Sequence, residues 1–338
     1  MKLYGGIDLH SNNSVISIKD ADGQIKARKK LPNDLQTIFR FLSPFKDALS
    51  GLVIESTFNW YWLVDALMEA DFCVHLANTT AIQQYSGLKY ADDNSDADWL
   101  AEMLRLGILP EGYIYPKEER TARDLMRKRM QLVQQSTQNL LSIQGIYMRH
   151  LNYKLSNNKI KQLNVEKIKQ DFSSANVAQA TQCNLIVMNC LKEQTQGIEQ
   201  TLLKQVKLRP DFQHLTSIDG IGNILSLTIM LETGEINRFN KVGNYASYCR
   251  CVSGARYSNG KKKGKTNSKN GNKYLAWAFI EAANFAIRFN KTVKSYYQRK
   301  LTKTNQTVAI KTVAHKLARA CFYVLRDQVD FDVKKAFG

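Results

Sequence analysis

Four carboxylates stand at positions where a metal site would need them. Asp8 follows the apolar run LYGGI, and Glu55 ends the apolar run GLVIE. Asp93 and Asp96 lie at the start of an expected helix, where a spacing of three residues places both on one helix face. Carboxylate oxygens are the hard ligands that Mg²⁺ prefers, and a cluster of them can hold two ions about 4 Å apart for chemistry at a phosphate.

Three of these acids also have an ordinary structural interpretation. Asp8 suits a turn that closes a hairpin. Asp93 suits a helix N-cap, and Asp96 suits the first turn of a helix, where a negative charge is favourable. Glu55 is different, because an unpaired carboxylate at the end of a buried run is costly. Two nearby acids are alternative ligands: Asp92 and Asp98.

A second segment whose side chains could take part in binding or chemistry spans residues 256–273, RYSNGKKKGKTNSKNGNK. It holds seven Lys or Arg residues and no acid, a composition that cannot pack a core and predicts an exposed loop or a cluster of tight turns. The alternative is a solvated charge run without a function. Aromatic residues on both sides of the segment favour a nucleic-acid site. The candidate contacts are Arg256, Lys261, Lys262, Lys263, Lys265, Lys269, Asn272 and Lys273.

A glycine-rich turn precedes this segment. Residues 214–234 read as helix, Gly-x-Gly turn and helix, with Gly220 and Gly222 in the turn. Such a turn can direct backbone N–H groups at a phosphate, so both glycines are candidate nucleic-acid contacts. The alternative is an ordinary connection between two packed helices.

The net charge of +18 points to a polyanionic partner, either nucleic acid or an anionic membrane surface. Split along the chain, it is −4 over residues 1–100, +6 over 101–205 and +16 over 206–338. No apolar run approaches the roughly 18 residues of a membrane span, and the start MKLYGGIDLH lacks a signal peptide's apolar core. We therefore expect a cytoplasmic protein without a membrane partner. The six cysteines form no CxxC pair, so we expect buried thiols and no structural zinc.

The front third must position the acids. Its pattern predicts three strands at 3–8, 14–19 and 24–31, followed by a helix at 34–49 and a strand at 51–55. A helix at 58–69, a strand at 72–77 and a helix at 94–106 complete the predicted order. This order is typical of the ribonuclease-H-like fold. In that fold the first strand, the fourth strand and the last helix converge on one point, which would bring the acids together.

The rest of the chain reads as mainly helical. Residues 118–150 and 174–206 predict two long helices, which form either an antiparallel hairpin or coiled coil, or two members of an ordinary bundle. The apolar stripe expected on the second helix is Val177, Ala180, Val187, Leu191, Ile198 and Leu202. An amphipathic helix is expected at 305–328. We expect three domains: an α/β domain at 1–110, a helical region at 111–205 and a mainly helical domain at 206–338.

Several motifs resemble one family. GIDLH, VIEST and DDNSDADWLA are similar to the Asp-Glu-Asp-Asp motif of insertion-sequence transposases of the "IS one-ten" type, whose relatives include Piv-like DNA invertases. IDGIGNILSLTIMLETGEINRF and NYASYCRCVSGARYSNGKKKGKTNSKNGNKYLAWAFIEAA resemble the C-terminal transposase domain of that family. Together the matches cover most of 1–105 and 210–300.

The resemblance implies a RuvC-like N-terminal domain and a DNA recombinase. It implies that Asp8, Glu55, Asp93 and Asp96 bind Mg²⁺, and that a serine becomes covalently linked to DNA. The family often has Ser-Ser-Gly or Gln-Ser-Gly at that serine, whereas this chain has Tyr-Ser-Asn-Gly at 257–260. Ser258 is the expected nucleophile and Ser253 the alternative. From the residues alone, Ser258 would be a polar turn residue.

The resemblance also implies partners: donor and target DNA, a structured noncoding guide RNA called a bridge RNA, and other copies of the chain in a dimer or tetramer. It places the protein at the nucleoid of a bacterial or archaeal cell. Two rival functions remain open at this point. One is a RuvC-like, structure-specific nuclease that uses water, and the other is a non-catalytic nucleic-acid-binding protein.

Overall fold

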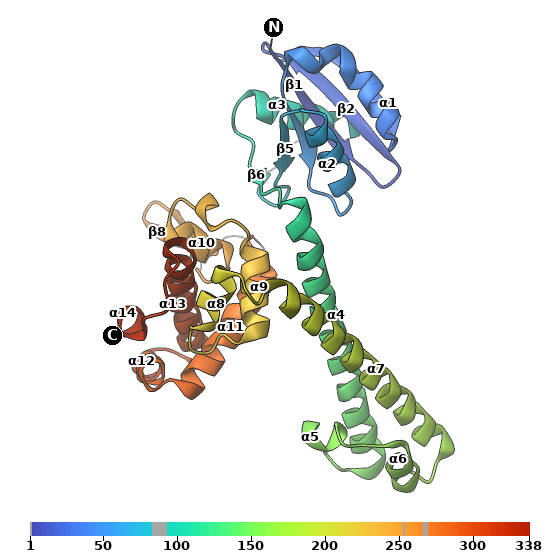
Figure 1. The fold of residues 1–338 in the computed structure, drawn as a ribbon, viewed down its shortest axis with the longest axis vertical. Helices are drawn as coiled ribbons and strands as arrows, with labels where there is room; N and C mark the ends of the chain where they lie inside the picture. The colour runs from blue at the N-terminus through green and yellow to red at the C-terminus, as the bar shows by residue number, and fades with distance from the viewer. Residues whose placement is uncertain (1, 83–92, 253, 266–269) are drawn as a thin grey trace. The chain divides into compact units, whose positions relative to one another are not determined.

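The computed structural model divides into two compact units, Met1–Lys117 and Glu118–Gly338 (Figure 1). It describes residues 2–82, 93–252, 254–265 and 270–338. The first unit holds 11 basic and 15 acidic residues, a net charge of −4, and the second holds 37 and 15, a net charge of +22. The expected fold class is confirmed: an α/β unit is followed by a mainly helical one. The expected separation of a helical middle from the C-terminal domain stays a prediction.

A mixed sheet forms the centre of the first unit. Its order is β3-β2-β1-β4-β5-β6, with β1 to β3 antiparallel and with β4 parallel to both β1 and β5. The expected order of strands and helices along the chain is confirmed, and the short antiparallel edge strand β6 is an addition. The strands are β1 (Leu3–Leu9), β2 (Asn13–Asp20), β3 (Ile25–Pro32), β4 (Leu49–Glu55), β5 (Val74–Ala77) and β6 (Glu111–Gly112).

Three α-helices accompany the sheet: α1 (Leu35–Leu42), α2 (Tyr61–Glu69) and α3 (Asp93–Arg105). The expected helix at 34–49 is wrong in its second half. There, α1 ends at Leu42, a short 3-10 helix covers Ser43–Ala48, and β4 already begins at Leu49. Pro44 explains the break, because proline lacks the N–H that would continue the helix ladder and its ring crowds the carbonyl group one turn before it.

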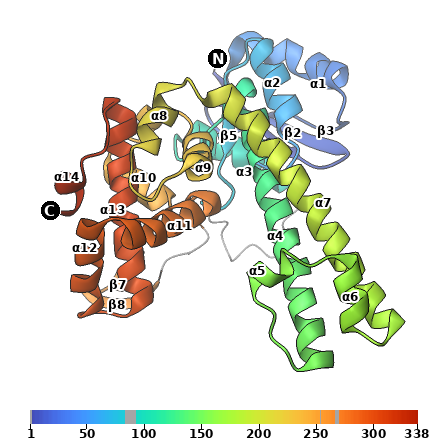
Figure 2. The ribbon, with the colours of Figure 1, turned by 60° about the horizontal axis from the view of Figure 1, so that its bottom comes forward.

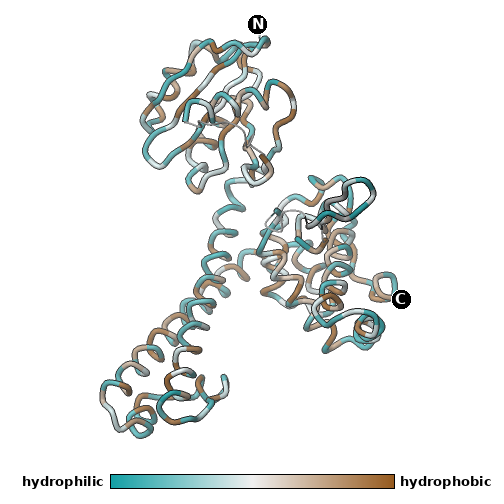
Figure 3. The backbone as a smooth tube through the Cα atoms, turned by 180° about the vertical axis from the view of Figure 1, so that it is seen from behind, coloured by the Kyte–Doolittle hydropathy of each residue, from teal (hydrophilic) through white to brown (hydrophobic). Residues whose placement is uncertain are grey.

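Two long helices, α4 (Lys117–Leu151) and α7 (Ala175–Val206), run side by side as a hairpin (Figures 1 and 2). Between them lie two short helices, α5 (Asn157–Ile160) and α6 (Val165–Asp171). Hydrophilic and hydrophobic residues alternate along both long helices (Figure 3). This hairpin confirms the two expected helices.

The stripe expected on α7 is confirmed at Leu202, which is buried, and at Val177 and Ile198, which pack against core clusters, but it is wrong at Val187 and Ala180. Val187 is 46% exposed and Ala180 is exposed, whereas Leu185 and Met188 are buried. The buried face packs in a cluster that includes Ile143 of α4 and Ile168 of α6. Because apolar residues occur on several sides of α7, the partner helices decide which side is covered.

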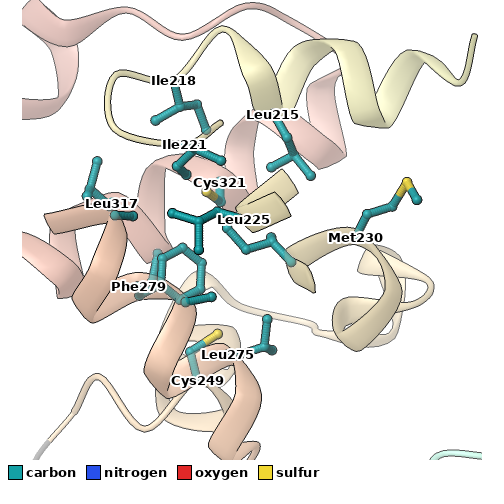
Figure 4. Close-up of a cluster of buried hydrophobic side chains, with 14 of the residues drawn as sticks. Leu215, Ile218, Ile221, Leu225, Met230, Cys249, Leu275, Phe279, Leu317 and Cys321 are labelled. Atoms are coloured by element: carbon teal, nitrogen blue, oxygen red, sulfur yellow. The ribbon is translucent and has the colours of Figure 1, made fainter. Parts of the chain in front are cut away.

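A helical bundle with its own core makes up the C-terminal part. In this core Leu225 of α9 and Phe279 of α11 meet Leu317 and Cys321 of α13 (Figure 4). The expected helices at 214–234 and 305–328 are present. The helices are α8 (Pro210–Thr216), α9 (Asn223–Thr233), the 3-10 helix η2 (Ile236–Arg238), α10 (Val242–Tyr248), α11 (Lys273–Phe289), α12 (Lys291–Leu301), α13 (Gln306–Asp327) and α14 (Val333–Phe337).

The basic segment is partly regular, so its interpretation as a loop or turn cluster is wrong for its first half. Strand β7 (Ala255–Ser258) pairs antiparallel with β8 (Lys261–Lys265). Asn259 and Gly260 form the turn, with φ of 49° and 70°. Asn-Gly is the preferred pair where both central residues of a hairpin turn need positive φ, so this signal was present in the sequence.

The burial expected for the cysteines is confirmed only for some of them. Cys249 and Cys321 are buried thiols, but Cys73, Cys183 and Cys190 are exposed, and all six cysteines are free. Over the described residues, no helix is long and apolar enough to cross a membrane.

Candidate active site

The first strand and the last helix of the α/β unit approach each other closely. A Cβ atom on Gly6 would lie 2.1 Å from the carbonyl oxygen of Ala97 in α3, so only glycine permits this contact. Alternate residues of a strand share a face, which places Asp8 on the Gly6 face of β1. The packing therefore brings Asp8 toward the first turn of α3, which carries Asp93 and Asp96.

Asp8 and Glu55 are neighbours across two parallel strands. Ile7 of β1 pairs with Ile54 of β4, and the two acids come directly after these residues. Burial of Asp8, a hydrogen bond with Glu55 and the charges of Glu55 and Asp96 raise the pKa of Asp8 to about 7, although the charge of His10 opposes this shift. Two carboxyl groups this close bind a proton when no cation is present.

His10 joins this group, although it was not among the residues predicted from the sequence. Its Nε2 lies 3.1 Å from Oδ2 of Asp8 and 3.4 Å from Oδ1 of Asp93. The three residues each offer one ligand atom, and these atoms lie within 4.8 Å of one another. The signal was the spacing Asp-x-His at a strand end, because residues i and i+2 share one face.

The ligand atoms fit a divalent cation. Oδ2 of Asp8 and Nε2 of His10 are buried, and among the described residues neither has a well-aligned hydrogen-bond partner. Buried polar atoms are nearly always satisfied, so two that face each other without a bond need an explanation. A metal ion would bind both, because carboxylate and neutral imidazole are common ligands of divalent metals.

The other three expected ligands lie around Asp8, and their environments differ. Glu55 and Asp96 line one cavity of about 330 Å³. Asp93 is partly exposed, and Lys30 donates to it at 3.1 Å, which holds the pKa of Asp93 below its usual range. The structure thus brings the four expected acids into one region at the ends of β1 and β4 and the start of α3.

Of the two alternative ligands, Asp98 has other partners and Asp92 is not described. Asp98 accepts a hydrogen bond from Ser17 Oγ at 2.5 Å and forms an ion pair with Arg28, so its carboxylate holds α3 to β2 and β3. Asp92 lies outside the described residues.

Ser258 lies in the second unit, exposed at the end of β7 and beside the Asn259-Gly260 turn. Its register partner is Lys261, and Lys261 and Lys263 are exposed. Ser253 and Lys269 lie outside the described residues. The same holds for the side chains of Arg256, Lys262 and Lys265.

The far end of the basic segment is anchored. Asn272 is 7% exposed, and its Oδ1 accepts hydrogen bonds from the backbone N–H groups of Tyr274 and Leu275, which caps α11. Its Nδ2 donates to Glu232 at 2.7 Å. Asn272 therefore holds the segment in place, whereas Lys273 is exposed with its Nζ 5.1 Å from the centre of the Tyr274 ring.

Glu232 is the centre of a buried charge network. Arg123 donates to it at 3.1 Å, and Arg127 donates at 2.5 and 2.8 Å. Burial alone would raise the pKa of Glu232, but Arg127, Arg123 and Asn272 together hold it below its usual range. The network ties α4 to α9 and to the start of α11, and therefore to the end of the basic segment.

The two glycines of the expected phosphate-binding turn have different environments. Gly220 has φ of 90°, and a Cβ there would lie 2.5 Å from the carbonyl oxygen of Ala282, so this glycine is required for packing. Gly222 begins α9 without a side-chain cap, and a Cβ there would meet nothing within 4 Å. Its contact with a phosphate stays a prediction.

Two family models match the chain. Residues 5–150 match a transposase model of the IS110 type with a DEDD motif, and residues 212–298 match the transposase model described as the IS116/IS110/IS902 family. The chain belongs to the IS110-type insertion-sequence transposases. No curated protein matches it. The four acids lie in the first matched segment and Ser258 in the second. Membership makes this transposase an enzyme of DNA recombination, and its DEDD domain implies use of a divalent metal.

Proposed function

We propose that this transposase cleaves and rejoins DNA through a covalent link to Ser258, assisted by Mg²⁺ held by Asp8, Glu55, Asp93 and Asp96. The observation that carries the proposal is the cluster of ligand atoms at the end of β1, where Asp8 Oδ2 is buried, faces His10 Nε2 at 3.1 Å and has no well-aligned hydrogen bond among the described residues. The all-oxygen character of the four acids suits Mg²⁺.

The proposed chemistry assigns a role to each group. Oγ of Ser258 attacks the scissile phosphorus and loses its proton, while the bond from phosphorus to the leaving deoxyribose oxygen breaks and that oxygen takes up a proton. A serine hydroxyl is a weak nucleophile at neutral pH and needs activation. When bound, Mg²⁺ supplies stabilisation of the charge on the phosphate and the leaving oxygen. Lys261 and Lys263, both exposed near Ser258, would neutralise the phosphate.

A covalent phosphoserine suits recombination. The ester keeps the free energy of the broken DNA bond, so a second transfer to a DNA hydroxyl can rejoin the strands without another energy source. A nuclease that uses water would lose that energy. The exposed serine, which precedes a tight turn and pairs in register with Lys261 after it, supports this choice over the nuclease.

Trapping of a protein–DNA adduct tests the proposal. The protein is incubated with DNA from the ends of its element, its associated RNA and Mg²⁺, and covalent adducts are detected on denaturing gels. Ser258→Ala should abolish the adduct, and Ser253→Ala should retain it. Asp8→Asn should abolish cleavage and leave DNA binding within about twofold. An adduct that survives Ser258→Ala and disappears with Ser253→Ala would reverse the assignment, and cleavage to free 5′-phosphate ends without any adduct would establish the nuclease.

We further propose that a structured noncoding RNA guides the enzyme. The net charge of +22 on the second unit supports a large polyanionic partner. Sequencing of RNA that copurifies from cells carrying the whole element should recover one structured species. Equal recombination before and after removal of that RNA would contradict the proposal.

A dimer or tetramer is the third part of the proposal. The α4–α7 hairpin leaves apolar side chains at its surface, among them Leu141 at 57% and Ile186 at 60% exposure. Light scattering of the purified protein should give a mass of two or four chains of 38.6 kDa. A monomer both with and without nucleic acid would contradict this part.

A further inference from the structure

The last helices of the chain form a second basic region, distinct from residues 256–273. Residues 282–326 contain ten Lys or Arg residues and no Asp or Glu. They include the second half of α11, all of α12 and nearly all of α13. Apolar residues of these helices are buried in the core, so the basic residues belong to a fixed scaffold and not to a loose tail.

Helices α12 and α13 pack against each other (Figure 2) and gather cations around one aromatic ring. Arg299, Lys300 and Lys316 lie 5.8, 5.4 and 4.9 Å from the centre of the Tyr296 ring. Arg319 is one turn further along α13 and exposed. We call Arg299, Lys300, Lys316 and Arg319 the Tyr296 cation cluster.

The positive charges of the four side chains repel one another. Burial and the charges of Lys300, Arg299 and Arg319 together lower the pKa of Lys316. His315 on the same helix is affected in the same way, since burial and the charges of Arg319 and Lys316 lower its pKa. Among the described residues no carboxylate forms an ion pair with the four cations, and Nζ of Lys316 donates to the carbonyl oxygen of Ala336 at 2.6 Å. The ring of Tyr296 offsets part of the repulsion through cation–π contacts.

We propose that the Tyr296 cation cluster binds the phosphodiester backbone of a nucleic-acid strand, at a place separate from the segment that carries Ser258. Four cations on two packed helices can contact successive phosphates, and the release of counterions drives such binding. An aromatic ring that pre-positions the cations lowers the entropy lost when they bind. The simpler interpretation, a solvated helix surface, does not explain why like charges converge on one ring.

This inference builds on the DNA recombination of the family and not on the serine mechanism. Its test therefore measures binding in EDTA, where no cleavage occurs. Fluorescence anisotropy is recorded with a duplex DNA and, separately, with an RNA hairpin of equal charge, at several salt concentrations. The arm with the larger effect identifies which nucleic acid uses the cluster.

The test variant is Arg299→Gln with Lys300→Gln, because neither side chain has a hydrogen bond or ion pair assigned among the described residues. Removal of two phosphate contacts should weaken binding about tenfold at moderate salt, and should lower the slope of log K against log salt by about 1.8. Arg319→Gln alone should lower it by about 0.9.

A matched control removes two exposed lysines, one on α6 and one on α7, as Lys169→Gln with Lys192→Gln, and changes the net charge equally. This control should keep at least most of the wild-type affinity and slope. Thermal unfolding of each variant verifies that it folds. If the cluster variants keep the wild-type slope with both nucleic acids, or lose no more than the control, the inference is wrong, whatever the result of the adduct experiment.

Discussion

At the scale of single residues, the protonation state of Asp8 determines how strongly the acidic site binds a metal ion. Burial and Glu55 raise the pKa of Asp8 to about 7, well above the ordinary value of about 3.9 for aspartate. Below pH 7 the carboxyl therefore holds a proton, and a cation must displace it. Above pH 7 the carboxylate is ready to bind.

We expect the metal affinity to follow this titration. As the pH falls from 7 to 6, the affinity for Mg²⁺ or Mn²⁺ should fall by up to about tenfold, and above pH 7 it should level off. Calorimetric titration between pH 5.5 and 8 measures the profile. Asp47→Asn, at an exposed acid outside the site, should preserve the profile, whereas Asp8→Asn should abolish it. A wild-type affinity that does not change across this range would contradict the role of Asp8.

His10 gives a second expectation for the same site. His10→Ala should weaken Mn²⁺ binding more than Mg²⁺ binding, because imidazole nitrogen is a better ligand for Mn²⁺ than for the harder Mg²⁺. Electron paramagnetic resonance of Mn²⁺, with Mg²⁺ as competitor, measures both affinities. Equal affinities in the wild type and the variant would show that His10 does not contact the ion.

At the scale of elements, packed helices and strands hold the chemistry in place. Gly6 allows α3 to lie against β1, and Glu232 joins α4, α9 and the start of α11. Loss of the Glu232 carboxylate is costly, because Arg123 and Arg127 would lose the buried anion that they share.

Glu232→Gln should lower the free energy of unfolding by about 3 kcal/mol. The pKa of Glu232 is below its usual range in the folded protein, so its contribution is present at neutral pH and is lost as the pH falls through that folded pKa. Urea unfolding at pH 7 measures the difference. Glu193→Gln, at an exposed position on α7, serves as the control and should change stability by less than about 0.5 kcal/mol. A similar small effect at Glu232 would mean that the network contributes little.

At the scale of the whole molecule, charge separates the two units. The first carries −4 and the acids that suit a cation, and the second carries +22 and the serine. Binding of nucleic acid by the second unit does not require the metal, since phosphate contacts depend on Lys and Arg.

Chelation should therefore separate the two activities. In EDTA, we expect strand cleavage to stop while nucleic-acid binding stays within about twofold. An increase in salt from 50 to 200 mM should weaken that binding by about 10³-fold or more, as expected for six or more phosphate contacts. Filter binding and gel assays on the same samples measure both. Loss of binding in EDTA would show that the metal site also holds the DNA.

The sequence by itself determined much of this protein. Alternation, turn residues and strand-end acids are local signals, so the strand order and the candidates Asp8, Glu55, Asp93 and Asp96 could be read directly. The Asn259-Gly260 hairpin was equally local and could have been found. Only the tertiary structure decided the rest. It placed His10 beside Asp8, paired Asp98 with Arg28, buried Leu185 in place of Val187, and gathered cations around Tyr296. These outcomes depend on contacts between segments far apart in the chain, and a local pattern does not specify which segment will lie opposite.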